Sequence, residues 1–536
     1  MTETDVLVVG AGPTGLTLAC DLLRHGVRAR VIDKSAMFFQ GSRGKGVTPR
    51  TVEVFDDLGI SEQAKAASTT LMFRHYDRCG GFRDQPLPGY WTPTPNSPYT
   101  QLLIPQGRTE QLLRDRLAAL GGSVELDTEL IELAQSAQSV QATLRNGRQT
   151  AHVDVRYLVG CDGGHSAVRR MLGAVFEGST HESQKILIGD VEVAGLRRDR
   201  LHVWFDATRG FLQLCPFSGT AAWQFAAGLP EWGAHPPAPS LETFQQVVDH
   251  IAGHDRIRLA STTWLSTYRV NARMVDQMRW RRVFLAGDAA HVHPPTGGLG
   301  MNTGIQDAYN LGWKLALVLT GGAGPRLLDS YEQERLPIAA WALGTSSDRL
   351  RAMTEEIANG SAGNLANVGT ADTRQLGLGY RWSTLSLDRG QPGIGLSAGD
   401  RAPDAPCQNL ATGAPTRLFD LFRGTRFTLL GFGDRCAAAL NTVNAAGLDR
   451  IHTALITDGR ATPHAVTVTL LDEKRHAFSG YGISHDSLIL VRPDGYIAAT
   501  TGWADARTIL DYLNQLGRTK AFRRSRKTDP LAISEP

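Results

Sequence analysis

The feature that most constrains this chain is a glycine-rich turn close to its start. A buried-strand pattern from Asp5 to Val9 leads into Gly10-Ala11-Gly12-Pro13-Thr14-Gly15, and helical spacing follows from Leu16 to His25. In such a motif the first glycine permits a tight turn, the second lets a pyrophosphate approach the backbone, and the third lets the helix pack on the strand. The helix N-terminus also attracts an anion. The sequence therefore predicts a dinucleotide-binding unit here.

The next apolar segment supports this interpretation. It runs from Ala29 to Ile32 and ends at Asp33, about 20 residues after the turn, where a carboxylate can accept a hydrogen bond from a ribose hydroxyl. A glycine turn that binds nothing is the alternative, and the strand, the helix and the acid together argue against it.

Two further strand ends carry acidic residues. One apolar run ends in Asp162-Gly163, with Ser166 and Arg169 on the helix expected to follow; alone, this is a common strand-to-helix turn. The other is the run Phe284 to His291, which contains Gly287-Asp288 and continues through a Pro/Gly loop into a helix from about Asn302 to Leu319. An Asp at this strand end suits a sugar-alcohol hydroxyl. His291 and His293 could suggest a metal, but no third or fourth ligand is evident, so we expect none.

Together, these motifs resemble those of the class A flavoprotein aromatic hydroxylases, the p-hydroxybenzoate hydroxylase fold, over residues 4–345. The variant that the chain most resembles is the longer actinomycete type that hydroxylates aromatic polyketides and phenols and carries a thioredoxin-like C-terminal domain. Leu488 to Ala498 is similar to the closing segment of that domain. The resemblance implies an α/β fold in which a Rossmann-like FAD-binding domain of the glutathione-reductase type is interleaved with an antiparallel-sheet substrate domain.

The domain boundaries follow changes in periodicity. From about Leu187 to Ala227 the apolar period is two, as in an antiparallel sheet. We expect the first part of the FAD-binding domain over 1–174, the substrate domain over 175–280, and the rest of the FAD-binding domain with a helical connection over 281–395. A thioredoxin-like domain over 396–517 and a basic tail over 518–536 follow. The Pro/Gly/aromatic-rich stretch 74–98 is expected to be a loop towards the substrate domain, either a lid or disordered.

The resemblance also implies the cofactors and their contacts. FAD would be resident, with NADPH or NADH as a transient co-substrate and O2 as oxidant. Arg43 would reach the phosphates, Gln106 the ribityl chain and Leu130 the adenine, through its backbone. Asp288 would hold a ribityl hydroxyl, and Pro295 would lie near the oxygen-reacting face. The full set of expected FAD contacts is Gly10, Gly12, Pro13, Thr14, Gly15, Asp33, Lys34, Arg43, Gly46, Val47, Gln106, Leu130, Asp162, Asp288, Pro295, Gly298, Gly300, Met301 and Asn302.

Substrate contacts are harder to assign from the sequence. Leu299 stands where many relatives have Gln, which is expected to alter how the flavin edge is held. No residue that activates the substrate can be named. Aromatic and polar residues of the sheet domain are candidates for the pocket, although each alone is more often part of a core: Trp204, Phe211, Gln213, Trp223 and Phe225.

The resemblance implies a monooxygenase that hydroxylates an electron-rich aromatic through a flavin C4a-hydroperoxide, with the chemistry supplied by the cofactor. Baeyer–Villiger or decarboxylative oxygenation on the same scaffold stays open, as do a flavin oxidase or dehydrogenase and a non-catalytic flavin-binding protein. The single strand–GxGxxG–helix unit leaves no separate domain for NAD(P)H.

Composition narrows the partners and the compartment. The net charge of +3 creates no strong positive potential that would attract nucleic acid. No run reaches the roughly 18 apolar residues that a membrane span needs. Six scattered cysteines without a CxxC motif indicate a reducing compartment, so we expect a cytoplasmic monomer or homodimer. A thioredoxin-like domain without CxxC would not be redox-active.

Overall fold

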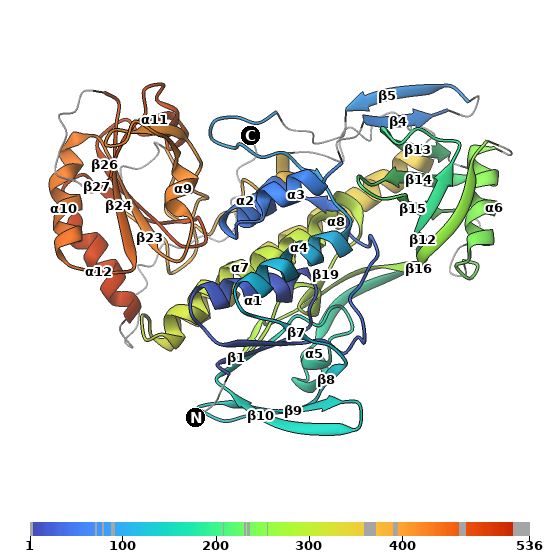
Figure 1. The fold of residues 1–536 in the computed structure, drawn as a ribbon, viewed down its shortest axis with the longest axis horizontal. Helices are drawn as coiled ribbons and strands as arrows, with labels where there is room; N and C mark the ends of the chain where they lie inside the picture. The colour runs from blue at the N-terminus through green and yellow to red at the C-terminus, as the bar shows by residue number, and fades with distance from the viewer. Residues whose placement is uncertain are drawn as a thin grey trace.

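A computed structural model describes residues 4–69, 72–77, 80–86, 92–206, 208–229, 232, 236–253, 256–358, 371–389, 395–459 and 468–517. The chain forms three bodies (Figure 1). A helix-covered sheet lies in the middle, a large twisted sheet lies on the right, and the C-terminal body lies on the left. The basic tail expected over 518–536 lies outside the described residues.

The central body is a six-stranded, mainly parallel sheet. Its strand order is β17 (Arg279–Trp280), β18 (Val283–Leu285), β11 (Tyr157–Gly160), β1 (Val6–Val9), β2 (Ala29–Ile32) and β7 (Val124–Glu125). All pairs are parallel except β17 with β18. β1, β11 and β18 are buried throughout, as expected of strands covered on both faces. Because β17 and β18 come after the strands β12 to β16 of the second sheet in the chain, the predicted interleaving is confirmed.

Helices and a small sheet cover the two faces of this body. α1 (Pro13–Arg24) packs against both α4 (Gln106–Ala119) and α7 (Leu299–Leu319) on one side (Figure 1). On the other lie α5 (Ala167–Met171) and an antiparallel sheet of β8 (Thr128–Gln135), β9 (Val140–Asn146) and β10 (Gln149–Val155). Further elements are α2 (Pro49–Asp57), α3 (Ser61–Ala67), the two-stranded ribbon β3 (Gly46–Val47) with β6 (Leu102–Leu103), and the long helix α8 (Asp329–Ala358).

The second sheet has eight strands. Their order is β19 (His291–Val292), β16 (Arg258–Val275), β12 (Phe176–Ala194), β15 (Ala222–Gly228), β14 (Gly210–Pro216), β13 (Arg200–Asp206), β4 (Met72–Tyr76) and β5 (Phe82–Pro86). The expected antiparallel core, β16-β12-β15-β14-β13, is confirmed.

One expectation about this sheet was wrong. Part of the stretch 74–98, expected to be a lid or a disordered loop, forms the hairpin β4–β5, and β4 pairs in parallel with β13. The described prolines do not prevent this, because Pro86 ends the edge strand, where a missing N–H costs little. Residues 87–91 lie outside the described part of the chain.

The two faces of the large sheet have different partners. On the face here called the outer face, Leu187, Trp204, Trp223 and Phe225 form a core with α6 (Leu241–Ala252), and the Phe225 ring stacks on Phe244 at 4.1 Å between centroids. On the opposite, inner face, Leu201, Val203, Cys215 and Phe217 pack with Leu103 of the β3–β6 ribbon. The inner face therefore faces the central body.

The C-terminal body is a second eight-stranded sheet with mixed pairing. Its order is β20 (Leu387–Asp388), β27 (Ile497–Gly502), β26 (Ser487–Val491), β23 (Phe427–Phe432), β24 (Ile451–Thr457), β25 (Thr469–Leu471), β21 (Pro406–Asn409) and β22 (Pro415–Arg417). α9 (Leu418–Phe422), α10 (Ala437–Ala445), α11 (His476–Gly480) and α12 (Ala506–Gly517) surround it. The predicted α/β character is confirmed; the thioredoxin-like assignment stays a prediction.

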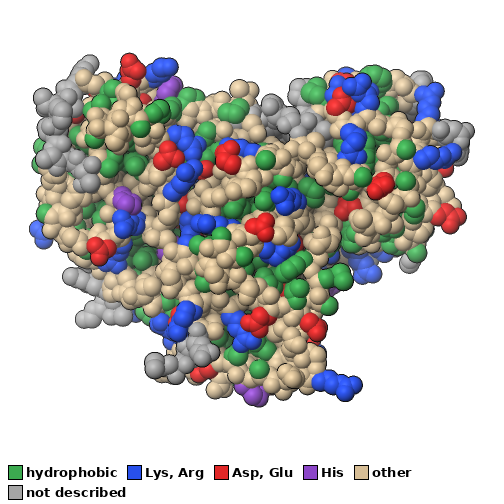
Figure 2. Space-filling view, viewed as in Figure 1, with side chains coloured by type: hydrophobic (Ala, Val, Ile, Leu, Met, Phe, Trp, Pro, Cys, Tyr) green, Lys and Arg blue, Asp and Glu red, His purple; other side chains and the backbone are tan. Residues whose placement is uncertain are grey.

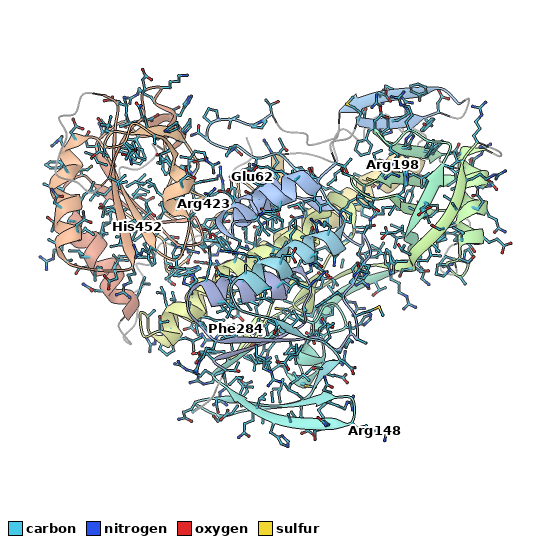
Figure 3. All side chains as sticks on the ribbon, viewed as in Figure 1. Glu62, Arg148, Arg198, Phe284, Arg423 and His452 are labelled. Carbon is cyan, nitrogen blue, oxygen red and sulfur yellow. The ribbon has the colours of Figure 1, made fainter. Side chains whose placement is uncertain are left out.

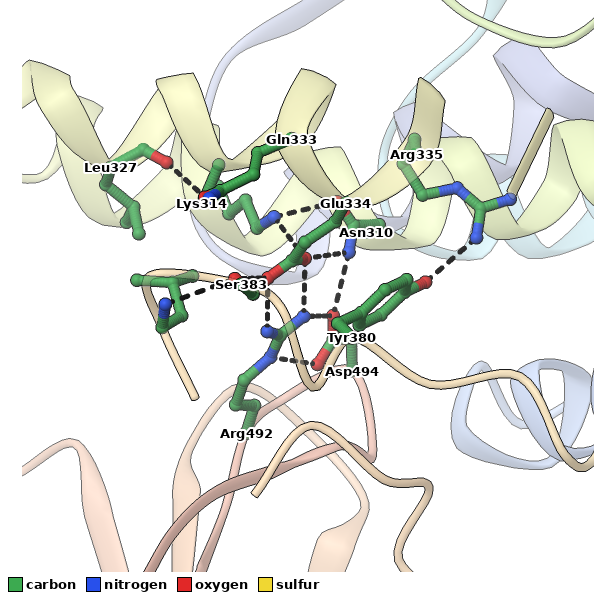
Figure 4. Close-up of polar contacts among 12 residues, drawn as sticks. Asn310, Lys314, Leu327, Gln333, Glu334, Arg335, Tyr380, Ser383, Arg492 and Asp494 are labelled. Carbon is green, nitrogen blue, oxygen red and sulfur yellow. Dashed lines mark hydrogen bonds and ion pairs between the residues drawn. The ribbon is translucent and has the colours of Figure 1, made fainter. Parts of the chain in front are cut away.

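A buried ionic cluster joins the C-terminal body to α7 and α8 (Figure 4). Arg492 donates from Nη1 and Nη2 to the two carboxylate oxygens of Glu334, at 2.7 and 3.0 Å, and both side chains are completely buried. Lys314, Asn310 and Ser383 also donate to Glu334, and Arg492 donates to Asp494 as well. At the edge of the same interface, Arg423, which Figure 3 labels near α9, binds Asp56 of α2 at 2.7 Å.

The outside of the molecule carries both signs of charge. Figure 2 shows basic and acidic side chains interspersed over the visible face. The five cysteines of the described part are unpaired. None of the helices in that part combines the length and the apolar character needed to cross a membrane.

Candidate functional site

Four of the predicted motifs lie at one edge of the central sheet. Gly10 follows β1, Asp33 follows β2, Asp162 follows β11 and Gly287 follows shortly after β18. Because β2, β1, β11 and β18 are adjacent and parallel, their carboxyl ends meet, which is where ligands bind in open sheets of this kind.

The glycine turn has the shape that a pyrophosphate needs. Gly10 has φ +105°, and a Cβ on it would lie 2.4 Å from the Cys161 carbonyl oxygen. A Cβ on Gly15 would lie 2.0 Å from the Gly10 carbonyl oxygen. A Cβ on Gly12, in contrast, would meet nothing within 4 Å, and no side chain caps the helix that starts there. The open space beside Gly12 and the uncapped N–H groups in the first turn of α1, to which Pro13 itself contributes none, fit a dinucleotide phosphate.

Asp33 supports this turn. Its Oδ2 accepts from the Ala11 N–H at 2.8 Å and its Oδ1 accepts from the Ser35 N–H at 2.9 Å. Each oxygen retains a lone pair, so a ribose hydroxyl can still bind. Lys34 beside it is exposed. Leu130 is 2% exposed, so its side chain lies in the protein interior and is not available to an adenine.

Among the residues that the structure describes, none binds the Asp288 carboxylate. The side chain is exposed, and it has no hydrogen bond or ion pair within the part of the chain that the structure describes. The surrounding protein desolvates it and raises the pKa of Asp288, whereas the charges of His291 and Arg43 act in the opposite direction. Thr14 fills the space between the backbones of Gly287 and Gly304 and so fixes this turn against α1. An accessible, unpartnered carboxylate here fits a polyol hydroxyl.

Four predicted residues meet at the loop 41–47. The Gly44 N–H donates to Gln106 Oε1 at 3.1 Å, and a Cβ on Gly44 would lie 3.5 Å from the Met301 Sδ. Asn302 Nδ2 donates to the Gly46 carbonyl at 2.8 Å. The convergence of Gly46, Gln106, Met301 and Asn302 was predicted from segments far apart in the sequence.

Some expected roles need refinement at this point. The Asn302 side chain is fully buried, and Oδ1 accepts from the Thr48 N–H while Nδ2 also donates to the Gly298 carbonyl, so only its backbone can serve a cofactor. The Val47 side chain is likewise fully buried. Leu299 is 0% exposed, so the expected change at the flavin edge does not follow: its side chain lies in the protein interior.

The N-terminus of α7 is open. Gly297 and Gly298 both have positive φ, +82° and +63°, and a Cβ on Gly298 would meet nothing within 4 Å. Pro295 and Gly298 are exposed, Gly300 is half-buried, and no side chain caps the helix. The N–H groups that begin this 21-residue helix are therefore free to meet a carbonyl-rich or anionic ring edge.

The expected cofactor contact of Asp162 stays a prediction, and its carboxylate already has partners within the protein. Its Oδ1 accepts from Ser166 Oγ at 2.5 Å and its Oδ2 accepts from the Ala167 N–H at 2.6 Å, so it caps α5. Arg43, expected near the phosphates, lies 4.8 Å above the Phe39 ring and 5.9 Å from the Trp264 ring and is exposed. His291, weighed as a metal ligand, places Nε2 2.6 Å from Asp307, which Arg335 also binds.

The substrate candidates divide between the two faces of the large sheet. Trp204, Trp223 and Phe225 lie on the outer face, at 7%, 0% and 0% exposure under α6, and we correct their expected role: they belong to a core. Phe211 and Gln213 lie half-buried on the inner face. Strand parity separates the groups, because alternate residues point to opposite faces.

A polar group on the inner face was missed. Lys45 Nζ donates to Gln224 Oε1 at 2.5 Å, and Gln224 Nε2 lies 3.0 Å from Ser42 Oγ. The Ser42 N–H donates to Asp190 Oδ2 at 2.8 Å. The position of Lys45 between Gly44 and Gly46, in a loop already assigned to the flavin, was the available signal.

The chain matches two protein-family models, FAD binding domain over residues 3–346 and Aromatic-ring hydroxylase, C-terminal over residues 396–516. It is 41% identical over 528 residues to a flavin-dependent monooxygenase of Mycobacteroides abscessus, covering 95% of this chain and 99% of that protein. It is 34% identical over 448 residues to pentachlorophenol 4-monooxygenase of Sphingobium chlorophenolicum, covering 80% of each. Its structure is similar to aklavinone-11 hydroxylase with FAD and aklavinone (TM-score 0.81, 26% identity, 97% and 100% covered).

Proposed function

The chain belongs to the FAD-dependent aromatic-ring monooxygenases, and on that premise we propose that it hydroxylates a phenolic or polycyclic aromatic compound held against the inner face of the large sheet. The observation that carries this proposal is the Asp288 carboxylate, which has no hydrogen bond or ion pair among the described residues and lies near two uncapped helix N-termini, those of α1 and α7. Few cofactors other than a flavin dinucleotide present a pyrophosphate, a polyol chain and a carbonyl-rich ring to one site.

We propose the following division of the cofactor among the residues. Gly12, Pro13 and Thr14 hold the pyrophosphate, Asp33 the adenosine ribose, and Asp288 the ribityl chain, with Gln106 on its other side. Met301 and the backbone from Gly298 to Asn302 line the pyrimidine edge of the ring. When bound, FAD supplies the transfer of electrons from NAD(P)H to O2 and the activated oxygen atom.

The protein then contributes binding, charge and exclusion of water. The free N–H groups at Gly298 to Met301, with the dipole of α7 behind them, stabilise negative charge on the ring edge that they face. The inner face of the sheet covers the reacting side and keeps water from it. The hydrogen bond from Tyr268 Oη to the His293 carbonyl, 2.9 Å, ties that face to the loop before α7.

We further propose that the enzyme works in the cytoplasm as a monomer or homodimer, with a small aromatic molecule rather than a nucleic acid as its partner. The unpaired cysteines of the described residues and the interspersed charges of Figure 2 support this proposal.

The experiment that tests the function is anaerobic reduction of the purified holoenzyme by NADPH or NADH, followed in the visible flavin bands, with a panel of phenols and quinones. The proposal expects at least one phenol to accelerate bleaching. Flavin that binds but bleaches with neither reductant, whatever ligand is added, would favour a non-catalytic flavin-binding protein. Analysis of the products separates hydroxylation from Baeyer–Villiger or decarboxylative outcomes.

A further inference from the structure

Tyr268 lies where the large sheet meets the cofactor site. A row of half-buried residues crosses the inner face on the neighbouring strands β14, β15, β12 and β16; its members are Gln213, Ala226, Ile188 and Ser266. Tyr268 comes two residues after Ser266 on β16, so it shares that face, about 7 Å along the strand. β16 also pairs with β19, the strand that leads into the loop before α7. Tyr268 therefore borders both the surface assigned to the substrate and the loop assigned to the cofactor.

The loop between β19 and α7, residues 293–298, is anchored on two sides by side-chain hydrogen bonds. Its two prolines have no N–H group to donate, so these anchors matter more than they would in an ordinary loop. Thr296 Oγ1 donates to the Ser346 carbonyl at 2.6 Å, which joins the loop to α8. Tyr268 Oη donates to the His293 carbonyl at 2.9 Å, which joins the loop to the sheet. The second anchor stands just before Pro295, the residue expected near the oxygen-reacting face.

The Tyr268 hydroxyl remains a hydrogen-bond donor. Burial raises the pKa of Tyr268, and the negative charge of Asp288 acts in the same direction. The phenol therefore stays protonated and keeps its proton for the His293 carbonyl. The influence of Asp288 also shows that this carboxylate, assigned to the polyol chain of the cofactor, lies near the tyrosine.

Transfer of an oxygen atom needs the substrate ring and the cofactor ring at a fixed separation, because a displacement of about 1 Å can cost roughly 100-fold in rate. We propose that Tyr268 is a positioning residue, which holds the loop 293–298 against the inner face of the sheet and so directs the oxygen atom to the substrate. This inference rests on the proposed function and adds a residue to it. In coupled turnover NADPH, a proton, O2 and substrate give NADP+, water and hydroxylated product. In uncoupled turnover NADPH, a proton and O2 give NADP+ and hydrogen peroxide.

The test variant, Tyr268→Phe, loses the hydroxyl and keeps the ring. Hydroxylated product and hydrogen peroxide are both measured during aerobic turnover of the holoenzyme with NADPH and the phenol to which it responds best. The ratio of peroxide to product is expected to rise about 2- to 10-fold, the equivalent of one net hydrogen bond. A second measurement needs no turnover. Amide hydrogen exchange of the oxidised holoenzyme should become about 2- to 10-fold faster in peptides that cover residues 287–302, because the loop opens more often.

Tyr481→Phe is the matched control. Tyr481 Oη donates to the Pro403 carbonyl at the same 2.9 Å, and this buried tyrosine belongs to the C-terminal body. Its loss should leave both the peroxide ratio and the exchange of residues 287–302 at their wild-type values. Unchanged exchange in Tyr268→Phe, or faster exchange with a wild-type peroxide ratio, would refute the role of Tyr268 while the hydroxylase function stands. A wild type that forms hydroxylated product from no phenol would refute the proposed function and, with it, this inference.

Discussion

Replacing Arg492 by Met should strongly destabilise the junction between the C-terminal body and the central body. Arg492 and Glu334 are both 0% exposed, and two hydrogen bonds of 2.7 and 3.0 Å join them (Figure 4). Breaking a buried ion pair by removing one partner typically costs about 3–5 kcal/mol, because the remaining charge stays buried. Lys314, 2.7 Å from Glu334, remains beside that carboxylate, but the buried Asp494 also loses its arginine, so we expect the upper end, about 5 kcal/mol.

A surface pair of the same geometry provides the control. Arg381 also makes two hydrogen bonds to a carboxylate, Asp400, at 2.6 and 2.7 Å, but its side chain is 63% exposed. Arg381→Met should therefore cost less than about 1 kcal/mol. Urea unfolding of the holoenzyme measures both variants, with tryptophan emission as one probe, since Trp313 lies 5.2 Å from the Arg492 guanidinium, and flavin emission as the other. Equal unfolding midpoints for the two variants would refute the argument.

Four further predictions follow from the site and the core. Gly12→Val should leave the apoprotein folded by circular dichroism but prevent FAD uptake, because its side chain would fill the space assigned to the pyrophosphate; normal flavin content would contradict this. Asp288→Asn should weaken FAD binding about 10- to 100-fold in a flavin-fluorescence titration, the equivalent of one hydrogen bond to a charged group. Trp223→Ala should lower the free energy of unfolding by about 3–5 kcal/mol. Phe211→Ala should leave stability nearly unchanged and weaken phenol binding. The reverse result would contradict the assignment of Trp223 to the core and of Phe211 to the substrate pocket. Burial alone would raise the pKa of Glu334, but Arg492 and Lys314 hold this pKa below its ordinary value. The stabilisation from the ionised carboxylate is therefore present above the unfolded-state pKa and is lost as the pH falls. The stability difference between wild type and Arg492→Met should accordingly shrink below about pH 4.

The sequence was most informative where local chemistry and long-range order coincide. The strand–glycine–helix unit predicted β2 to the residue and β1 to within one residue, because a parallel buried strand leaves a local pattern, but it placed the start of α1 three residues too late. Loops from distant segments were correctly grouped only through the family resemblance, which supplied the tertiary arrangement that places Gly44 beside Gln106 and Met301.

The failures have a common physical cause: the sequence does not show which groups a side chain will meet. The sequence places Asp162 at a strand end, but it does not show that the carboxylate also caps α5. Trp223 and Phe225 were predicted to line the pocket, but in the structure α6 covers them and they belong to a core. Lys45 and Gln224 are 179 positions apart in the sequence, and no local pattern predicts their contact. The hairpin β4–β5 was not predicted, because the prolines and aromatic residues around it favoured a loop.

The central claim is that this protein transfers an oxygen atom from O2 to an aromatic ring, and isotope labelling tests it most directly. The holoenzyme is supplied with NADPH, with the phenol that most accelerates flavin reduction, and with 18O2 in unlabelled water. The mass of the product is then measured by mass spectrometry. The account predicts one 18O atom in the hydroxylated product. Product formed without 18O, or NADPH consumed with release of hydrogen peroxide alone for every substrate tried, would contradict it.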